Sequence, residues 1–190
     1  MKDSLRYNLR VIFVLTFASL ICGFVLSFVF NSAKAKIKEN EKKDIYRAIY
    51  QIVDNCKNVK EKRINEETVY YLFKEKDELI GYAYLSQGQG YQGKIKILFA
   101  VDKSIERLLG IEIIESVETP GLGSRINEED FKNQFKNLKT NVPVECVKFS
   151  PQKENQVQAI TSATISSRAV VSILNKGIQT LKSLVKEDGK

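Results

Sequence analysis

The chain has 190 residues, enough for one domain and a modest extra segment. Its formal net charge of +7 does not indicate nucleic-acid binding, because the basic residues are spread along the chain and interleaved with acids. The sequence contains no histidine, which excludes His-based acid–base catalysis and Ser-His-Asp triads. Its three cysteines form no CxxC pair, so we predict neither a metal site nor a catalytic side chain.

An uncharged stretch lies near the N-terminus. Residues 11–30, VIFVLTFASLICGFVLSFVF, contain no charge, and about 20 apolar residues in a helix span about 30 Å of bilayer hydrocarbon. A cleaved signal peptide is the alternative, and residues 31–33 leave a cleavage site conceivable, but its apolar core would be shorter, about 7–15 residues. A lipoprotein signal fits less well, because Cys22 follows Ile21 rather than a small residue. We predict an uncleaved transmembrane helix at 11–30.

Basic residues flank both ends of this helix. Lys2, Arg6 and Arg10 lie in the N-terminal segment 1–10, and five lysines between positions 34 and 43 follow the helix, partly offset by acids. Charge counting under the positive-inside rule therefore does not orient the chain. Residues 31–60 come next, and we predict a helical linker there because apolar residues recur with helical spacing.

Residues 61–190 are predicted to form one domain of the α+β class, with a mainly antiparallel sheet and a C-terminal helix. Runs of β-branched and apolar residues predict strands at 68–73, 79–85, 94–101, 108–116 and 142–149, the first two forming a hairpin. A short helical turn after Asn127 should carry Phe131 and Phe135 inward. The closing helix is expected to begin at Ala163 or Thr164 and to end at position 185.

A glycine-rich stretch, GQGYQG at 88–93, matches the GxGxxG pattern. A dinucleotide fingerprint needs these glycines to follow a strand and open a helix. Here the next residues, KIKILFAV, are typical of a strand. The pattern therefore favours a glycine-rich connection between two strands over a Rossmann motif.

A second loop, ETPGLG at 118–123, combines a proline with two glycines. Pro120 holds Thr119 extended, and Pro-Gly predicts a type II turn with Gly121 at the position of positive φ. One interpretation is a plain surface turn. The other is that the missing Cβ atoms let backbone amides lie close to a flat or anionic ligand.

The stretch QAITSATISSR at 158–168 concentrates hydroxyl side chains at the start of the closing helix. They are Thr161, Ser162, Thr164, Ser166 and Ser167. Helix capping needs only one of them. An anion attached at Thr164 would instead meet free backbone N–H groups and the positive end of the helix dipole. Arg168, four residues further on, could then pair with a phosphate. Both interpretations remain open from the residues alone.

QAITSATISSRAV resembles the flavinylation motif of the FMN-binding domain family, Asp-x-x-Ser/Thr-Gly-Ala-Thr/Ser. Gln158 stands where the motif has Asp, and Ser162 stands where it has Gly. Together with ETPGLG, GYQGKI and a single N-terminal anchor, the whole chain resembles the G subunit of the Rnf electron-transport complex. It is also similar to the C subunit of the sodium-translocating NADH:quinone reductase.

This resemblance implies a cofactor and its site. FMN would be joined through its phosphate to Thr164 by a flavin transferase that recognises the segment containing Thr161, Ser162 and Ala163. By its helical spacing from Thr164, Arg168 would neighbour that phosphate. Glu118, Thr119, Gly121 and Leu122 of the ETPGLG loop would lie against the flavin.

The resemblance also implies a place in the cell and a set of partners. The N-terminus would be cytoplasmic and the FMN domain extracytoplasmic, in a membrane complex that couples ferredoxin:NAD electron transfer to ion translocation. A free-standing flavinylated domain, a component like the reductase C subunit and a non-redox anchored adaptor are the alternatives. As an electron carrier, the chain alone need not turn over a substrate.

Overall fold

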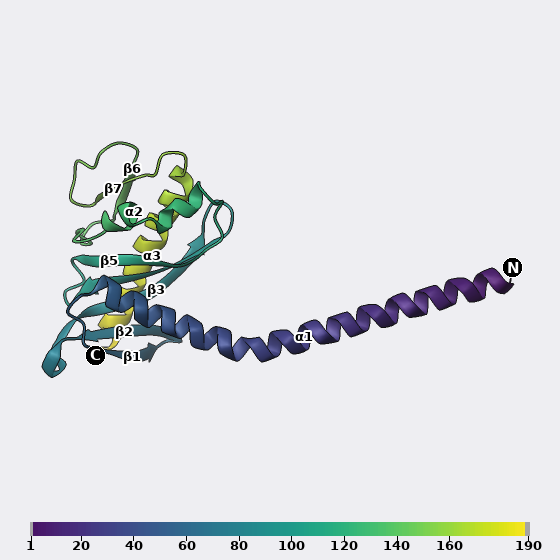
Figure 1. The fold of residues 1–190 in the computed structure, drawn as a ribbon. Helices are drawn as coiled ribbons and strands as arrows, with labels where there is room; N and C mark the ends of the chain where they lie inside the picture. Colours follow the sequence, from purple (N-terminus) through teal and green to yellow (C-terminus); the bar gives the residue numbers. More distant parts are fainter. Residues whose placement is uncertain (1, 189–190) are drawn as a thin grey trace. The chain divides into compact units, whose positions relative to one another are not determined.

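The computed structural model describes residues 2–188 (Figure 1). The chain divides into two compact units, one ending at Lys43 and one beginning at Asp44. The first helix, α1, runs over Lys2–Ile52 and therefore contributes to both units. Among the described residues it is the one helix long and apolar enough to cross a membrane, and its apolar stretch is not buried within the protein. These properties are those expected of the predicted transmembrane helix.

The second unit is built around a five-stranded antiparallel sheet in which each strand pairs with the next along the chain. The strands are β1 (Asn58–Ile64), β2 (Glu67–Phe73), β3 (Leu79–Gln89), β4 (Lys94–Asp102) and β5 (Leu108–Ser116). The short elements are η1 (Glu75–Asp77), η2 (Gly123–Asn127), α2 (Glu129–Asn133) and the parallel pair β6 (Glu145–Val147) and β7 (Gln156–Gln158). The chain ends in α3 (Thr164–Asp188). The predicted α+β class with a mainly antiparallel sheet and a C-terminal helix is confirmed.

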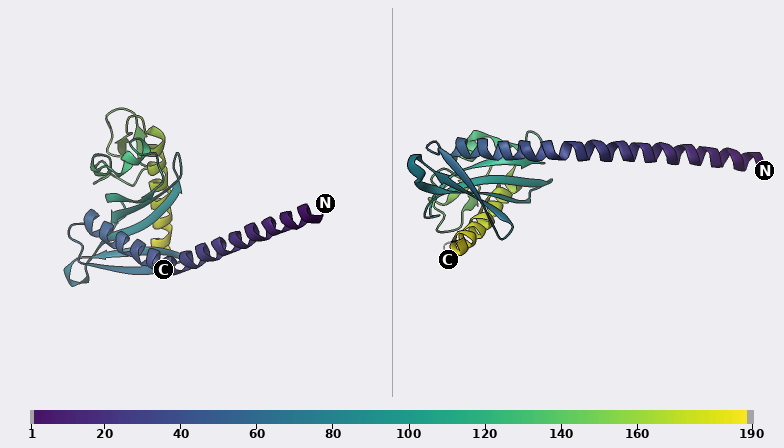
Figure 2. Two further views of the ribbon diagram at one scale, coloured as in Figure 1. Left: turned by 45° about the vertical axis from the view of Figure 1, so that its right-hand side comes forward. Right: turned by 90° about the horizontal axis from the view of Figure 1, so that it is seen from below.

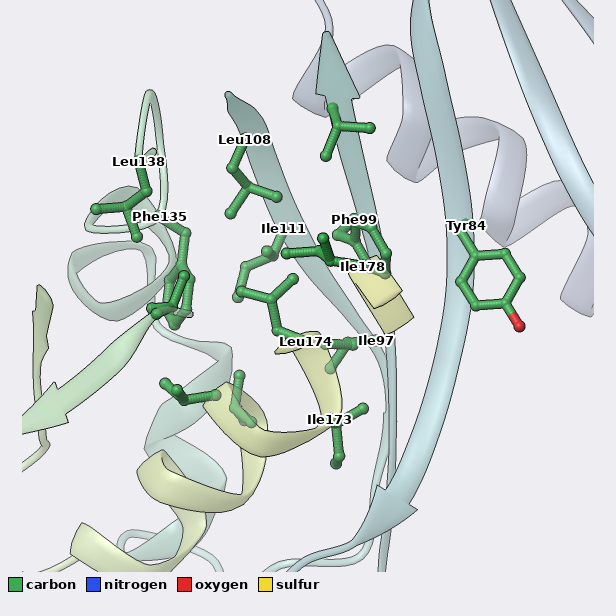
Figure 3. Packing of buried hydrophobic residues seen from close by; sticks show 14 of the residues in the cluster. Tyr84, Ile97, Phe99, Leu108, Ile111, Phe135, Leu138, Ile173, Leu174 and Ile178 are labelled. Atoms are coloured by element: carbon green, nitrogen blue, oxygen red, sulfur yellow. The ribbon is translucent and has the colours of Figure 1, made fainter. Parts of the chain in front are cut away.

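Helix α3 covers one face of the sheet, as both views of Figure 2 show. Its buried side chains recur with helical spacing, and Figure 3 shows Leu174 and Ile178 directed toward Ile97, Phe99 and Ile111. A glycine lies in the middle of α3 because a Cβ at Gly177 would come within 2.6 Å of the Phe99 ring. The helix therefore comes close to the sheet at Gly177.

The last turns of α1 cover the opposite face. Ile45, Ala48 and Ile49 share one side of the helix and, with Val53 just after its end, pack on a cluster that includes Leu72, Ala83, Leu98 and Ala100. Strand β4 is therefore buried on both faces, because its alternate side chains enter the two clusters in turn. Residues 44–60 of the segment predicted as a linker thus belong to the folded domain.

Several predicted elements differ in extent from those observed. Strand β1 was not predicted, and the strand expected at 142–149 is reduced to β6. Helix α1 ends at Ile52, before the end of the helical linker predicted over residues 31–60. The chain turns after Val53, and Lys57 N–H, just before β1, donates to the carbonyl of Phe73 at the end of β2. Phe131 in α2 and Phe135 just after it are buried, as predicted. The connection between β3 and β4 confirms that the GxGxxG stretch joins two strands.

The cysteines of the domain lie on opposite faces of the sheet. Cys56 is buried in the cluster beneath α1, and Cys146 packs against the cluster beneath α3. All three cysteines of the chain are free thiols. A disulfide between Cys56 and Cys146 would need the sheet between them to open, so we expect both to stay reduced in the folded protein.

Two tyrosines anchor the α3 side of the sheet to carboxylates. The Tyr71 hydroxyl donates to Asp188 Oδ2 at 2.6 Å, and the Tyr84 hydroxyl donates to Glu67 Oε2 at 3.0 Å. Burial first, and then these hydrogen bonds, raise the pKa of both hydroxyls above the ordinary value of 10.0. Because the folded pKa is raised, the stabilisation is complete below pH 10 and is lost as the pH rises through the folded value.

The unfolding free energy is therefore expected to fall as the pH rises above about 10. Urea unfolding of the full chain in detergent, followed at a series of alkaline pH values, measures this decline. Tyr71→Phe removes one of the titrations that cause the decline, so the decline should become shallower in that variant. An equally steep decline in Tyr71→Phe would contradict the assignment.

Candidate functional site

Three segments meet at the end of the sheet where β4 begins. They are the β3–β4 turn, the loop after β5 and the first turn of α3. The turn is closed by Gly90 N–H donating to the Gly93 carbonyl at 2.7 Å, and Val117 N–H donates to the Lys94 carbonyl at 3.2 Å. A pocket of about 420 Å³ lies between the segments. Its lining consists of Tyr91, Glu118, Thr119, Leu122, Gly123 and residues 162–166.

The ETPGLG loop has the turn that its sequence predicts. Leu122 N–H donates to the Thr119 carbonyl at 3.2 Å, and Gly121 between them has φ of +74°. The Thr119 hydroxyl donates to the Gln92 side-chain oxygen at 2.5 Å, which ties this loop to the glycine-rich turn. The loop thus forms a fixed wall of the pocket rather than a free surface turn.

Glu118 is the centre of the arrangement. Its side chain is only 7% exposed, and its two carboxylate oxygens accept hydrogen bonds from the other two segments. Oε2 accepts from the Ser166 hydroxyl at 2.7 Å, and Oε1 accepts from Gln92 N–H at 3.2 Å. A Cβ at Gly90 would lie 2.2 Å from Oε1, and one at Gly123 would lie 2.4 Å from Oε2. The glycines of both motifs therefore leave the space that the carboxylate occupies.

The hydroxyls at the start of α3 have different environments. Ser167 lies at the buried base of the turn, where its Oγ donates to the Ala163 carbonyl and accepts from Ile160 N–H. Ser166 is the donor to Glu118. Thr164 is the first residue of α3, is half-buried and lines the pocket. Thr161 and Ser162 are exposed.

Free backbone donors surround Thr164. Within the described part of the chain, the N–H groups of Thr164, Ile165 and Ser166 have no hydrogen-bond acceptor, and neither does the Thr164 hydroxyl. The first N–H groups of a helix lack partners inside the helix and carry the positive end of its dipole. Thr164 is therefore a hydroxyl in a position suited to carry an anion.

Ser162 is held in a strained backbone conformation. Its φ is +70°, in the left-handed region that favours glycine, and glycine is the residue that the flavinylation motif has here. We expect Ser162→Gly to raise the unfolding free energy by about 1 kcal/mol by removing this strain. Urea unfolding measures the change. Ser162→Ala is the matched control, because it removes the hydroxyl but keeps the Cβ, and it should bring no such gain.

The structure brings only some of the predicted site residues together at the pocket. Glu118, Thr119, Leu122, Ser162, Ala163 and Thr164 all line the pocket. Arg168 does not, because it lines a separate hollow beside β6 with Glu145, Cys146 and Val147. Thr161 and Gly121 are exposed outside the lining.

Four lining residues were not predicted as site residues, namely Tyr91, Gly123, Ile165 and Ser166. The signal for Tyr91 was its place within the glycine-rich turn. The signal for Ser166 was its place in the first turn of the closing helix.

The comparison with protein families matches residues 90–179 to the FMN-binding domain family. This range begins in the glycine-rich turn and includes both the ETPGLG loop and the first turns of α3. Residues 90–179 are thus similar to an FMN-binding domain. Every segment that lines the pocket falls within this matched range.

Curated relatives match most of the chain. The G subunit of the proton-translocating ferredoxin:NAD(+) oxidoreductase complex of Clostridium ljungdahlii is 27% identical, over 87% of this chain and 86% of the relative. The G subunit of the ion-translocating oxidoreductase complex of Methanosarcina acetivorans is 26% identical, over 94% and 96%. The G subunit of the Na(+)-translocating ferredoxin:NAD(+) oxidoreductase complex of Acetobacterium woodii is 34% identical over 61% of this chain and 56% of its own length. The predicted resemblance to the Rnf G subunit is confirmed.

Two solved structures are similar to this chain in fold. The C subunit of the Na(+)-translocating NADH-quinone reductase from Parabacteroides distasonis is 26% identical, with a TM-score of 0.52 over 58% of each chain. NqrC of Shewanella oneidensis gives a TM-score of 0.53 over 62% of this chain and 61% of its own, at 18% identity. The match thus spans less than two thirds of each solved chain. These relatives support a redox subunit of an ion-translocating complex, and the apolar helix indicates a membrane location.

Proposed function

We propose that this chain is the membrane-anchored electron-transfer subunit of an Rnf-type complex and carries FMN joined through its phosphate to Thr164. Two findings support the assignment: the family match, and the curated G-subunit relatives that align along 86% and 96% of their own length. The single observation that supports the linkage is the position of Thr164, which is a half-buried hydroxyl inside the pocket and at the start of α3.

The pocket has properties suited to a flavin. Its volume of about 420 Å³ lies within the range of about 300–1,000 Å³ usual for small-molecule sites. Three apolar side chains from different segments line it and remain open to solvent: Tyr91 is 67% exposed, Leu122 48% and Ile165 57%. Such a lining suits a flat aromatic ring with one edge accessible to a redox partner.

The start of α3 provides what a phosphodiester needs. The free N–H groups of Thr164, Ile165 and Ser166 can donate to phosphate oxygens, and the dipole of a long helix favours negative charge there. The Thr164 hydroxyl would be esterified by a flavin transferase, with the exposed residues Thr161 and Ser162 in the segment that the transferase binds. Arg168 would contact the phosphate only after a rearrangement, because it lines another hollow in this structure.

The protein's contribution is to hold and orient the flavin. FMN, when bound, supplies one- and two-electron transfer. Glu118, Thr119 and Gln92 fix the loops around the pocket, and the chain need not supply a side chain that moves protons. A covalent tether would also keep the flavin from diffusing away on the outer side of the membrane. We propose that the FMN domain lies on that side, with the N-terminus in the cytoplasm.

A second candidate is an NqrC-like component of a sodium-translocating NADH:quinone reductase. The shared fold favours it, but the matched region covers 58–61% of the solved NqrC chains, against 86–96% of the first two G-subunit relatives. The length of the match therefore favours an Rnf-type complex. Affinity purification of the tagged full chain from its native membranes distinguishes the candidates by the subunits that accompany it. Recovery of the chain without any other subunit would indicate a free-standing flavoprotein.

The linkage is tested by co-expressing the full chain with a flavin transferase. The intact mass should rise by one FMN residue, and the protein band should fluoresce on a denaturing gel, because the bond survives unfolding. A chain exposed to the transferase that carries no flavin would overturn the proposal.

A further inference from the structure

The flavin pocket lacks a positively charged residue. Among the residues that the structure describes, its lining includes one ionisable charge, the acid Glu118. The two arginines nearest in sequence do not line it: Arg168 lies in the hollow beside β6, and Arg125 forms an ion pair with Glu128 at 3.1 Å. This lining differs from a usual phosphate site, in which Arg or Lys neutralises the ligand.

The negative charge of Glu118 is fixed in place. Both of its hydrogen bonds come from neutral donors, so neither of them balances the charge of the carboxylate. Gly90 lies next to one of its oxygens and Gly123 next to the other, and the residue is 7% exposed. The carboxylate therefore cannot swing into solvent to make room for a second anion.

The charge balance of the pocket depends on the form of the phosphate. The start of α3 supplies about +0.5 elementary charge and Glu118 supplies about −1, so the site is net negative before any ligand enters. A phosphate monoester carries about −1.5 to −2 at pH 7. A diester has lost one ionisable oxygen and carries only a single negative charge. Free FMN is therefore repelled more strongly than FMN tethered through its phosphate.

We propose that Glu118 makes this pocket discriminate against the free phosphate monoester, so that it accepts the flavin ring but retains FMN only as the diester at Thr164. The inference rests on the proposed function and extends it, because it names the residue that selects the tethered form. It also gives the tether a second role besides retention, since esterification removes the charge that the pocket rejects.

The test compares two flavins that differ only in the phosphate. The full chain is produced without transferase, purified in detergent and titrated with riboflavin or FMN, with binding followed by the change in flavin fluorescence. Riboflavin should bind at least as tightly as FMN. Glu118→Gln should raise the affinity for FMN about tenfold, or about 1.4 kcal/mol, and that for riboflavin less than about twofold.

The substitution preserves the hydrogen bonds of the site. A glutamine oxygen can accept from Gln92 N–H, and its amide can donate to the Ser166 hydroxyl, which can also act as an acceptor. Glu106→Gln is the matched control, because Glu106 is an exposed acid on the β4–β5 turn, at the other end of the sheet. It should change neither affinity.

Salt provides a measurement that needs no variant. Raising the ionic strength screens the repulsion, so the affinity for FMN should rise relative to that for riboflavin in the unmodified chain. Tighter binding of FMN than of riboflavin at low salt would overturn the proposal. So would an equal effect of Glu118→Gln on both flavins, or binding of neither flavin. A chain that gains FMN from the transferase but prefers free FMN over riboflavin would keep the proposed function and refute only the charge selection.

Discussion

Replacing Thr164 by alanine is expected to abolish covalent flavin attachment. The Thr164 hydroxyl, which lines the pocket and has no hydrogen-bond partner among the described residues, is then removed, while the Cβ and the first turn of α3 remain. After co-expression with a flavin transferase, the intact mass of Thr164→Ala should equal that of the unmodified chain, and its band should not fluoresce. Thr164→Ser retains a hydroxyl at the same atom and should recover part of the attachment.

Ser183→Ala is the matched control for this loss. Ser183 is exposed in the last turns of α3 and lies outside the pocket lining. The substitution deletes a hydroxyl at the far end of the same helix and should leave the mass increment in place. Retention of the FMN increment in Thr164→Ala, or its loss in Ser183→Ala as well, would contradict the assignment of Thr164 as the acceptor.

Replacing Gly123 by alanine is expected to disrupt the pocket. The added Cβ would lie 2.4 Å from Glu118 Oε2 and 2.7 Å from the Ser166 hydroxyl, so the hydrogen bond between them cannot persist. A buried carboxylate that loses a donor costs about 1–3 kcal/mol. Urea unfolding should show this loss. Flavin attachment by the transferase should also fall, because the first turn of α3 is no longer held to the ETPGLG loop.

Gly121→Ala separates pocket disruption from a general cost of adding a side chain to this loop. Gly121 faces open space, and its φ of +74° makes an alanine strained without a steric contact. We expect a loss of about 1 kcal/mol from the backbone alone and an undiminished FMN increment. Equal flavin loading in the two variants would show that the Glu118–Ser166 contact does not shape the site.

The parts of the fold that the sequence predicted are those with local patterns. Strands β2 to β5 carry runs of β-branched and apolar residues, and α3 has buried residues at helical spacing. Strand β1 escaped prediction because NVKEKRI contains a single buried residue, Val59, and four of its seven residues are charged. It is an edge strand, and charged side chains there oppose pairing with another chain. Strands β6 and β7 are three residues each and form only through their mutual pairing.

In the candidate site, too, the local features could be predicted from the sequence and the long-range contacts could not. The ETPGLG turn and the hydroxyl-rich start of α3 are local features, and both line the pocket. The contacts that join them are not local: Glu118 and Ser166 are 48 positions apart, and Gln92 and Glu118 are 26 apart. Arg168 was predicted from helix periodicity alone. The pocket lies beyond the end of the helix, so a residue one turn along it faces β6 instead.

The most direct measurement is to map the flavin on the tryptic peptide 154–168 of the chain co-expressed with a flavin transferase. This peptide contains all five hydroxyls at the start of α3, namely Thr161, Ser162, Thr164, Ser166 and Ser167. Fragment masses should place one FMN residue on Thr164 and on no other hydroxyl. FMN on one of the other four, or a peptide without flavin, would contradict the account.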